Sequence, residues 1–389
     1  MTASTLDQRR AAWLASLGRG DGLERWLLNL TASNTQRFRA AAARTDRNAI
    51  VATIGPSTTC GQSLNGGTTL MTGSWPMQMA AMLARQGVPA GASNMFGDHA
   101  CWATPQTAAN YMAGDTRVVL TGSAAPGPFT TAGGNGFAMN GAAGSITFTP
   151  VTSITTYEIW YRDGVGRNWS WSIDGGAATQ VSGAASPGPR RIVVRAASAG
   201  PRPITLTWVA GNVQIIGISG YDDTAGRREI SVYNWGISGA RSDQFLQNSD
   251  ATAGRMAMWS AVAPDLSILD DWAINDWRQA IALPVFRSNL VAGIAQGKLS
   301  GDVIVTTPLW DAGITGNTPL QSDYAAATIA AALEADVPVI DVRAAWRSFA
   351  IANGLGWYSD TVHPTLLGYA TKAALVGDVI RRVLNLWAR

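Results

Sequence analysis

The chain is poor in three residue types on which many binding sites depend. Its 389 residues include only two histidines, two cysteines and two lysines, Lys298 and Lys372. Two cysteines and two histidines at these separations build no zinc site. The arginines are largely offset by 26 acidic residues, which leaves a formal charge of +3 without a basic cluster interleaved with aromatic residues. The sequence therefore predicts no metal, no organic cofactor and no nucleic-acid partner.

Long apolar runs are also missing. Although 47% of the residues are hydrophobic, no segment approaches the roughly 20 apolar residues that a membrane-spanning helix needs. Residues 1–10 show no basic stretch followed by an apolar one, so no secretory signal is readable. We predict a globular protein without membrane insertion. The cytoplasm and export or virion association by another route remain open, and no pattern fixes the oligomeric state.

The two cysteines, Cys60 and Cys101, leave two interpretations open. A disulfide between them would close a loop of about 40 residues and contribute on the order of 3 to 5 kcal/mol. Two buried free thiols fit the sequence equally well.

The first 47 residues are predicted to form an N-terminal helical extension. Apolar residues recur at helical spacing in two stretches, one around Trp13 and Leu17 and the other from Trp26 to Phe38. We therefore expect two amphipathic helices between residues 5 and 45.

The rest of the chain changes texture twice. Residues 103–224 contain short alternating strands between Gly- and Pro-rich turns, which predicts an antiparallel, jelly-roll-like β-sandwich. On either side, at 48–102 and 225–389, strands alternate with helices, which is typical of a mainly parallel sheet covered on both faces. The predicted fold class is a three-layer α/β/α unit with an inserted sandwich. Its strands are expected at 48–54, 229–233, 265–273, 302–307 and 337–342.

Two segments at opposite ends of the chain fit one catalytic apparatus. Ser57 follows the strand at 48–54 in a Gly-Pro-Ser turn, and His363 stands three residues after Asp360, just before an apolar helical run. This spacing lets one turn bring the carboxylate to the imidazole Nδ1–H and leaves Nε2 free to take a proton from a serine. The other histidine, His99, is interpreted as a loop residue near the site. We predict a triad of Ser57, Asp360 and His363.

Two more polar positions follow predicted strands. Gly239 lies in the turn after 229–233, and Asn275 follows the strand beginning at 265. With Ser57 and His363 they resemble the SGNH (GDSL-type) hydrolase family, whose four blocks supply Ser, Gly, Asn and His in that order. The resemblance implies that Ser57 is the nucleophile, and that its N–H, the Gly239 N–H and the Asn275 side-chain amide form the oxyanion hole.

The chain departs from the family pattern at two positions. The Gly-Asp-Ser block reads Gly55-Pro56-Ser57, and the Gly-x-Asn-Asp block has Ala273 at its glycine position. Neither departure changes a group that makes or breaks bonds.

The sandwich carries many aromatic residues, among them Trp160, Trp169 and Trp171. Exposed rings of this kind stack on sugars, although alternation along the strands also fits packing in a core. We name these three as candidate substrate-binding residues, with Trp160 as the most exposed. A similar insertion occurs in bacterial peptidoglycan O-acetylesterases of the family that the chain resembles.

We therefore expect a serine esterase that removes small O-acyl groups, O-acetyl above all, from a carbohydrate through an acyl-enzyme. Its substrate would be an acylated carbohydrate or a small ester. A lipase, arylesterase or thioesterase with the sandwich as scaffold is one alternative. A non-catalytic carbohydrate-binding or virion adhesion protein is another.

Overall fold

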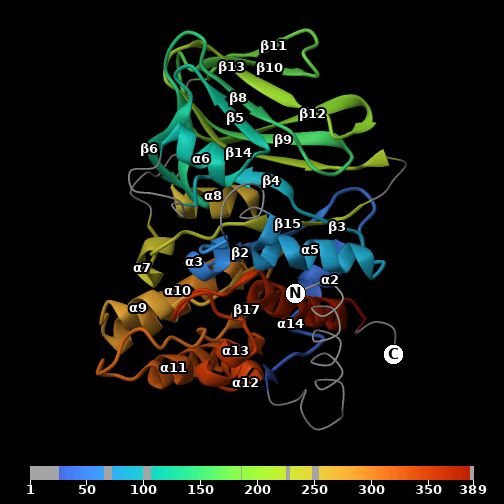
Figure 1. Ribbon diagram of the computed structural model, residues 1–389. Coiled ribbons are helices and arrows are strands. Elements are labelled where there is room, and N and C mark those ends of the chain that lie inside the picture. Colours follow the sequence, from blue (N-terminus) through green and yellow to red (C-terminus); the bar gives the residue numbers. More distant parts are fainter. Residues whose placement is uncertain are drawn as a thin grey trace.

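The computed structural model describes residues 26–64, 72–99, 107–184, 186–224, 228–247 and 254–385. Figure 1 shows an α/β unit at the bottom and a β-sandwich at the top. The predicted fold class, α/β with an inserted antiparallel sandwich, is confirmed. The predicted helix around Trp13 lies outside the described residues.

The central sheet has seven strands in the order β1-β18-β17-β16-β2-β15-β3. Only β1 runs antiparallel to its neighbour. After β2 the chain builds one side of the sheet and then crosses to β16 on the other, so the strand order reverses at β2. In such sheets ligands bind beyond the carboxyl ends of the strands at this reversal. The strands are β1 (Leu27–Leu28), β2 (Ala49–Ile54), β3 (Ala90–Gly91), β15 (Ile230–Asn234), β16 (Leu266–Leu269), β17 (Asp302–Thr306) and β18 (Val339–Ile340).

Helices cover both faces of this sheet because its inner strands are apolar on both sides. Along β2, Val51 joins one buried cluster and Ala52 and Ile54 join the other. The first cluster includes residues of α2 (Gln36–Ala42), α5 (Trp75–Arg85), α12 (Val342–Trp346), α13 (Phe349–Gly354) and α14 (Leu366–Asn385). The second includes residues of α7 (Ser242–Phe245), α8 (Arg255–Val262), α9 (Ala273–Arg278), α10 (Leu283–Ser300) and α11 (Gln321–Glu334).

The structure corrects two predicted elements. The helix expected to begin near Trp26 starts only at α2, because Leu27 and Leu28 instead pair with β18 as an edge strand. The strand expected at 265–273 ends at Leu269, and Ala273 already opens α9. Asp271 adopts φ 56° between them, a left-handed conformation that ends a strand. Asn275 therefore lies on a helix.

The sandwich consists of a five-stranded sheet, β11-β10-β13-β8-β5, and a six-stranded sheet, β12-β9-β14-β7-β6. The short strand β4 (Ser93–Phe96) pairs with β14, so the six-stranded sheet includes residues before the predicted boundary at 103. The boundaries of the four segments remain predictions. The other strands are β5 (Val118–Thr121), β6 (Ala125–Thr131), β7 (Gly134–Met139), β8 (Ser145–Phe148), β9 (Ile154–Asp163), β10 (Asn168–Ile173), β11 (Thr179–Val181), β12 (Gly188–Gly200), β13 (Ile204–Ala210) and β14 (Val213–Tyr221).

The aromatic residues of the sandwich are mostly buried, which corrects the expectation for Trp160. Its side chain is only 4% exposed and packs into the same core as Trp235 and Trp259 of the α/β unit. Trp169 is buried between the two sandwich sheets, edge-to-face with Tyr161. Trp171 is partly buried against that core. Trp160 and Trp169 therefore present no ring face to a sugar.

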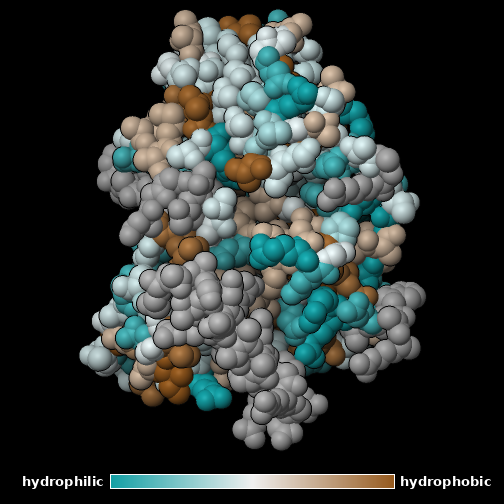
Figure 2. All heavy atoms as spheres, turned by 45° about the vertical axis from the view of Figure 1, so that its right-hand side comes forward, coloured by the Kyte–Doolittle hydropathy of each residue, from teal (hydrophilic) through white to brown (hydrophobic). Residues whose placement is uncertain are grey.

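The described helices and the visible surface can be compared with what a membrane-spanning protein requires. No helix in the described ranges is both long and apolar enough to span a bilayer. On the face shown in Figure 2, apolar residues form separate spots among hydrophilic ones.

Candidate active site

Ser57 occupies the first position of α3 (Ser57–Cys60), directly beyond the carboxyl end of β2. The Pro56 carbonyl accepts hydrogen bonds from Thr59 N–H (2.9 Å) and Cys60 N–H (3.2 Å), which closes the turn. Gly55 is required for this geometry, because a Cβ there would lie 2.3 Å from the Asp270 carbonyl oxygen. The close approach of the carboxyl ends of β2 and β16 thus fixes the position of the Ser57 backbone.

A tight turn after α13 holds the histidine. Asp360 Oδ1 accepts the backbone N–H of Val362 (2.7 Å) and of His363 (2.6 Å), while its Oδ2 lies 2.8 Å from His363 Nδ1. His363 Nε2 lies 3.1 Å from Ser57 Oγ, across 306 residues of sequence. The structure thus brings together all three residues of the predicted triad at hydrogen-bonding distances.

The surroundings of Asp360 favour its charged form. Partial burial acts to raise the pKa of this carboxyl, but the two backbone N–H groups and the imidazole outweigh burial and lower it. The carboxylate therefore stays ionised and can hold Nδ1–H, which directs Nε2 toward the serine.

The predicted oxyanion donors gather around the same turn. Gly239 follows β15 with φ 71°, and a Cβ there would meet nothing within 4 Å, so its backbone borders open space. The neighbouring Ile237 N–H donates to the Gly55 carbonyl at 2.8 Å, which places this turn beside the nucleophile. In the described part of the chain, neither the Ser57 nor the Gly239 N–H donates to another protein group.

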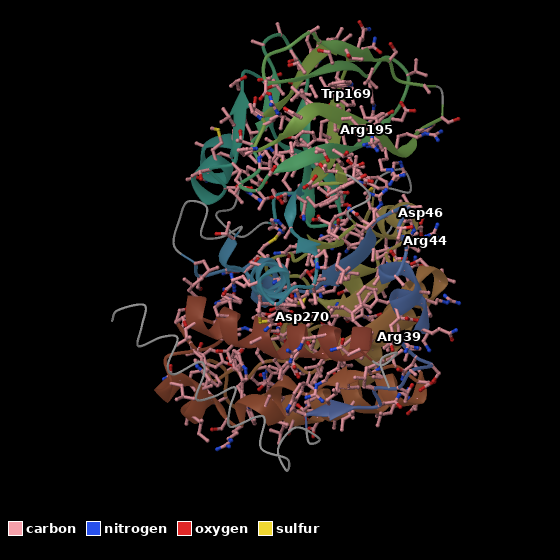
Figure 3. The ribbon with its side chains drawn as sticks, turned by 90° about the vertical axis from the view of Figure 1, so that its right-hand side faces the viewer. Arg39, Arg44, Asp46, Trp169, Arg195 and Asp270 are labelled. Carbon is pink, nitrogen blue, oxygen red and sulfur yellow. The ribbon has the colours of Figure 1, made fainter. Side chains whose placement is uncertain are left out.

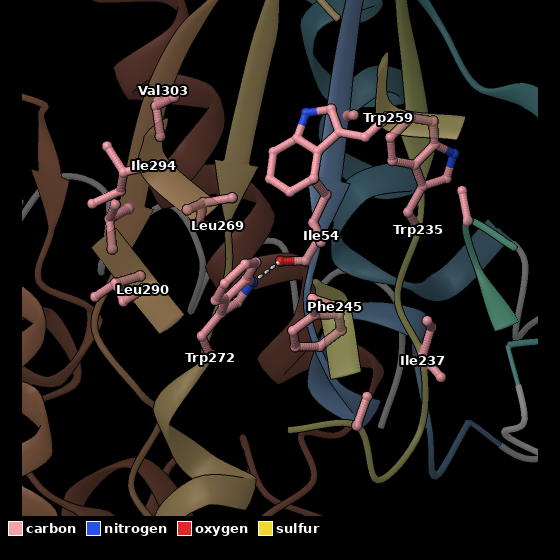
Figure 4. Packing of buried hydrophobic residues seen from close by; sticks show 14 of the residues in the cluster. Ile54, Trp235, Ile237, Phe245, Trp259, Leu269, Trp272, Leu290, Ile294 and Val303 are labelled. Carbon is pink, nitrogen blue, oxygen red and sulfur yellow. Dashed lines mark hydrogen bonds between the residues drawn. The ribbon is translucent and has the colours of Figure 1, made fainter. Parts of the chain in front are cut away.

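Asn275 reaches this turn from α9. Its Nδ2 donates to the Ala240 carbonyl at 2.9 Å, and an amide nitrogen has a second N–H to offer. The helix itself is fixed by Trp272, whose indole N–H donates to the Ile54 carbonyl at 2.8 Å and whose ring stacks on Phe245 (Figure 4). The three predicted donors thus belong to one neighbourhood.

His99 supports the same turn from beneath. It is buried with φ 54°, its Nδ1 lies 2.8 Å from the Gly236 carbonyl, and its own carbonyl accepts the Ser238 N–H at 2.8 Å. Burial lowers the pKa of its imidazole. The interpretation of His99 as a loop residue near the site agrees with this position.

Sequence reasoning missed a buried ionic network under the nucleophile turn. Asp270 and Lys372, both 0% exposed, lie with Nζ 2.7 Å from Oδ1. Asp270 also accepts hydrogen bonds from the Thr59 hydroxyl (2.6 Å) and the Trp75 indole (2.9 Å). Lys372 belongs to α14, the helix that begins just after His363. One ion pair therefore links the serine turn, the end of β16 and the histidine helix.

Asp271 completes the network by accepting the Thr58 hydroxyl at 2.6 Å. Complete burial raises the pKa of this carboxyl to about 7, although Lys372 opposes the rise. A double aspartate after a strand, and a lone lysine on an otherwise apolar helix face, are the sequence signals that could have indicated the network.

The described ranges contain no metal site and only one of the two cysteines. These ranges contain no group of three or more His, Cys, Asp or Glu side chains placed to hold a metal ion. Cys60 is buried and disulfide-bonded, so it is not a free thiol. Cys101 lies outside the described residues.

Comparison with known proteins agrees with the motifs. Residues 216–371 match the model of the GDSL-like Lipase/Acylhydrolase family. No curated protein sequence matches the chain. A peptidoglycan O-acetylesterase structure is similar, with a TM-score of 0.66 and 15% identity over 92% of this chain and 99% of that chain.

Two further solved structures match parts of the chain. A lipase/acylhydrolase from Enterococcus faecalis is 22% identical over 40% of this chain and 77% of its own, with a TM-score of 0.34. A family 35 carbohydrate binding module from Clostridium thermocellum is 18% identical over 27% of this chain and 93% of its own, with a TM-score of 0.23. These scores are too low to support a conclusion.

The predicted resemblance to the GDSL-type hydrolases is thus confirmed, and residues 216–371 are the part of the chain that matches the family model. The family match begins at residue 216 and omits Ser57, which the sandwich separates from the other blocks. In the folded chain, Ser57 nevertheless lies beside His363 of the last block.

Proposed function

We propose that the protein is a serine esterase that removes small O-acyl groups, O-acetyl above all, from a carbohydrate. The contact series Ser57 Oγ, His363 Nε2, His363 Nδ1 and Asp360 Oδ2, at 3.1 and 2.8 Å, carries the proposal. The similarity in fold to a peptidoglycan O-acetylesterase over almost the whole chain supports a carbohydrate ester as substrate.

In the first half-reaction, Ser57 Oγ attacks the ester carbonyl carbon while His363 Nε2 takes the hydroxyl proton. The carbonyl oxygen becomes an oxyanion, for which the N–H groups of Ser57 and Gly239 and the amide of Asn275 serve as donors. When the intermediate collapses, the C–O bond to the sugar breaks and His363 returns the proton to the sugar oxygen. The acyl group stays on Ser57.

In the second half-reaction, water replaces the sugar. His363 removes a proton from the water, whose oxygen attacks the acyl carbon, and the same donors stabilise the second oxyanion. Collapse releases the carboxylic acid and returns the proton to Ser57 Oγ. Asp360 orients the imidazole and stabilises its charged form in both halves.

The alternatives differ in measurable ways. A lipase or thioesterase would prefer long acyl chains or thioesters over acetate esters, and an arylesterase would ignore acetylated glycans. A non-catalytic adhesion protein would hydrolyse none of them. Rates on p-nitrophenyl acetate, butyrate and octanoate, followed by acetate release from O-acetylated peptidoglycan, separate these cases.

Ser57→Ala should lower the rate on p-nitrophenyl acetate by at least about 10³-fold, because removal of the nucleophile leaves only binding and oxyanion donors. The protein should still fold, and a fluorophosphonate probe should label Ser57 of the unchanged protein, as located by mass spectrometry. Ser33→Ala, at an exposed turn serine, is the control and should keep full activity. An adduct on another serine would contradict the assignment.

A further inference from the structure

A cavity of about 760 Å³ opens where the sandwich meets the α/β unit. Asn48, Ser231 and Asp265 line it, and they stand at the amino ends of β2, β15 and β16. Ser57 lies beyond the opposite end of β2, which at about 3.3 Å per residue is roughly 20 Å away. The cavity is therefore separate from the triad.

The two walls come from different parts of the chain. On β12, Ile192 and Val194 pack toward the sandwich core, so alternation turns Arg191, Val193 and Arg195 into the cavity. The carboxyl end of α10 and the end of α8 form the facing wall. In Figure 3, Arg195 of the sandwich and Asp46 of the α/β unit lie one above the other on the same side of the molecule.

The lining carries as many arginines as carboxylates. Arg191 pairs with Glu158 at 2.9 Å, and Arg195 pairs with Asp223 at 2.6 Å. A paired guanidinium keeps further N–H donors, and a paired carboxylate keeps further acceptor positions. The walls thus offer many donors and acceptors with no excess of either charge, which suits a neutral ligand rich in hydroxyl groups better than an anion or a cation.

Apolar contacts complete this chemistry. Val193 is half exposed and Leu299 is 76% exposed, and both line the cavity. Sugars present apolar C–H faces between their hydroxyl groups, so a polar cavity with an aliphatic rim matches them. The volume also falls in the range of about 300–1,000 Å³ that is usual for small-molecule sites.

We propose that this cavity binds a segment of a neutral carbohydrate chain, at a site distinct from Ser57. The binding does not depend on catalysis. Its consequence rests on the proposed function, because a polymer held here would stay near the triad and raise the effective concentration of its ester groups.

Binding is tested with the full chain carrying Ser57→Ala, on an array of neutral, uronate-containing and phosphorylated glycans. The variant Arg195→Ala/Gln296→Ala alters both walls. Asp223 keeps the Thr155 hydroxyl at 2.7 Å as a partner, so this change leaves no bare carboxylate. The control is Arg287→Ala, which removes a partly exposed arginine of α10 from an ion pair with Glu334 of α11, away from the cavity.

We expect retention of neutral glycans and a dissociation constant at least about tenfold higher in the double variant, with the control unchanged. Retention of anionic glycans alone, no retention of any glycan, or equal effects in variant and control would overturn the proposal. If the double variant fails to fold, Val193→Arg narrows the mouth without removing an ion pair and should weaken binding similarly.

Kinetics separate this proposal from the proposed function. With Ser57 restored, the double variant and the control should hydrolyse p-nitrophenyl acetate equally fast, while the double variant alone shows a higher KM on an O-acetylated neutral polymer. Absence of all ester hydrolysis would refute the esterase but leave glycan binding as measured. A fall in rate on p-nitrophenyl acetate confined to the double variant would refute a separate site.

Discussion

The two ends of the parallel strands hold ion pairs in different ways. At the carboxyl ends, Asp270 and Lys372 are completely buried, and Figure 3 shows Asp270 inside the α/β unit. At the amino ends, Asp265 pairs with Arg47, whose side chain is 42% exposed. A buried ion that loses its partner has no water to replace it, whereas an exposed one does. The Asp270–Lys372 pair therefore fixes the geometry around the serine turn, whereas the Asp265–Arg47 pair lines an accessible cavity.

This difference suits the two proposed roles. Acyl transfer needs Ser57 and His363 held at one separation, and the buried pair joins the serine turn to the helix that follows the histidine. Carbohydrate binding tolerates side chains that adjust, since hydroxyl groups can exchange places with water. Substitutions at the two ends can test whether the distinction is real.

The largest effect is expected for Lys372→Met. Removing the cation leaves the Asp270 carboxylate buried among neutral donors, which should lower the free energy of unfolding by about 3–5 kcal/mol. The only other lysine, Lys298, lies on the surface of α10, so Lys298→Met should change stability by less than about 0.5 kcal/mol. Urea unfolding at pH 7 measures both. Equal losses in the two variants would show that burial does not distinguish these charges.

A smaller, pH-dependent effect is expected for Asp271→Asn. The pKa of Asp271 is about 7 in the folded protein against an ordinary value of 3.8. Between these values the folded state keeps a proton that the unfolded state releases, so this group makes stability fall as pH rises from about 4 to about 7. The charged and titratable groups around it are Asp270, Lys372, Arg343, Tyr358 and Tyr369.

Asparagine does not titrate, so the variant lacks this pH-dependent loss. Across this pH interval its free energy of unfolding should rise, relative to that of the unchanged protein, by on the order of 2–4 kcal/mol. Unfolding free energies at pH 4.5, 6 and 8 provide the measurement. Asp265→Asn, at the amino ends, is the comparison. A constant difference between Asp271→Asn and the unchanged protein at all three pH values would contradict the assignment of the titrating group.

Local patterns account for what the sequence predicted correctly. Asp360 and His363 lie three residues apart, so a single turn determines their contact. The apolar run of β2 is followed by Gly-Pro-Ser, which ends the strand. Ser57 therefore lies beyond the carboxyl end of β2, whichever position β2 has in the sheet. These features depend on neighbours in sequence, which a pattern can show.

Contacts between distant segments account for the errors. Asp270 and Lys372 are 102 residues apart, and no periodicity connects them. For Trp160, alternation correctly separates its face of β9 from that of Tyr157 and Ile159. It cannot show that the α/β unit covers this face, so an exposed ring was the wrong prediction. Leu27 likewise fits the helical spacing of Trp26 and Leu30, but Leu27 and Leu28 pair with β18, which is distant in sequence, as an edge strand.

The smallest effect is expected for Arg47→Met at the amino ends. Arg47 contacts both oxygens of Asp265, at 2.7 and 2.5 Å, but water can reach its guanidinium. Asp265 also keeps the Ile50 N–H at 2.9 Å after the substitution. We therefore expect a loss of about 1 kcal/mol or less in the free energy of unfolding, and a loss that shrinks between 0.1 and 1 M salt because exposed charges are screened.

Urea unfolding at both salt concentrations tests this prediction. Lys372→Met is the buried counterpart, and its loss in the free energy of unfolding should barely change with salt. A salt-independent loss of 3 kcal/mol or more for Arg47→Met would mean that the amino ends hold their charges as rigidly as the carboxyl ends, and the contrast between the two would fail.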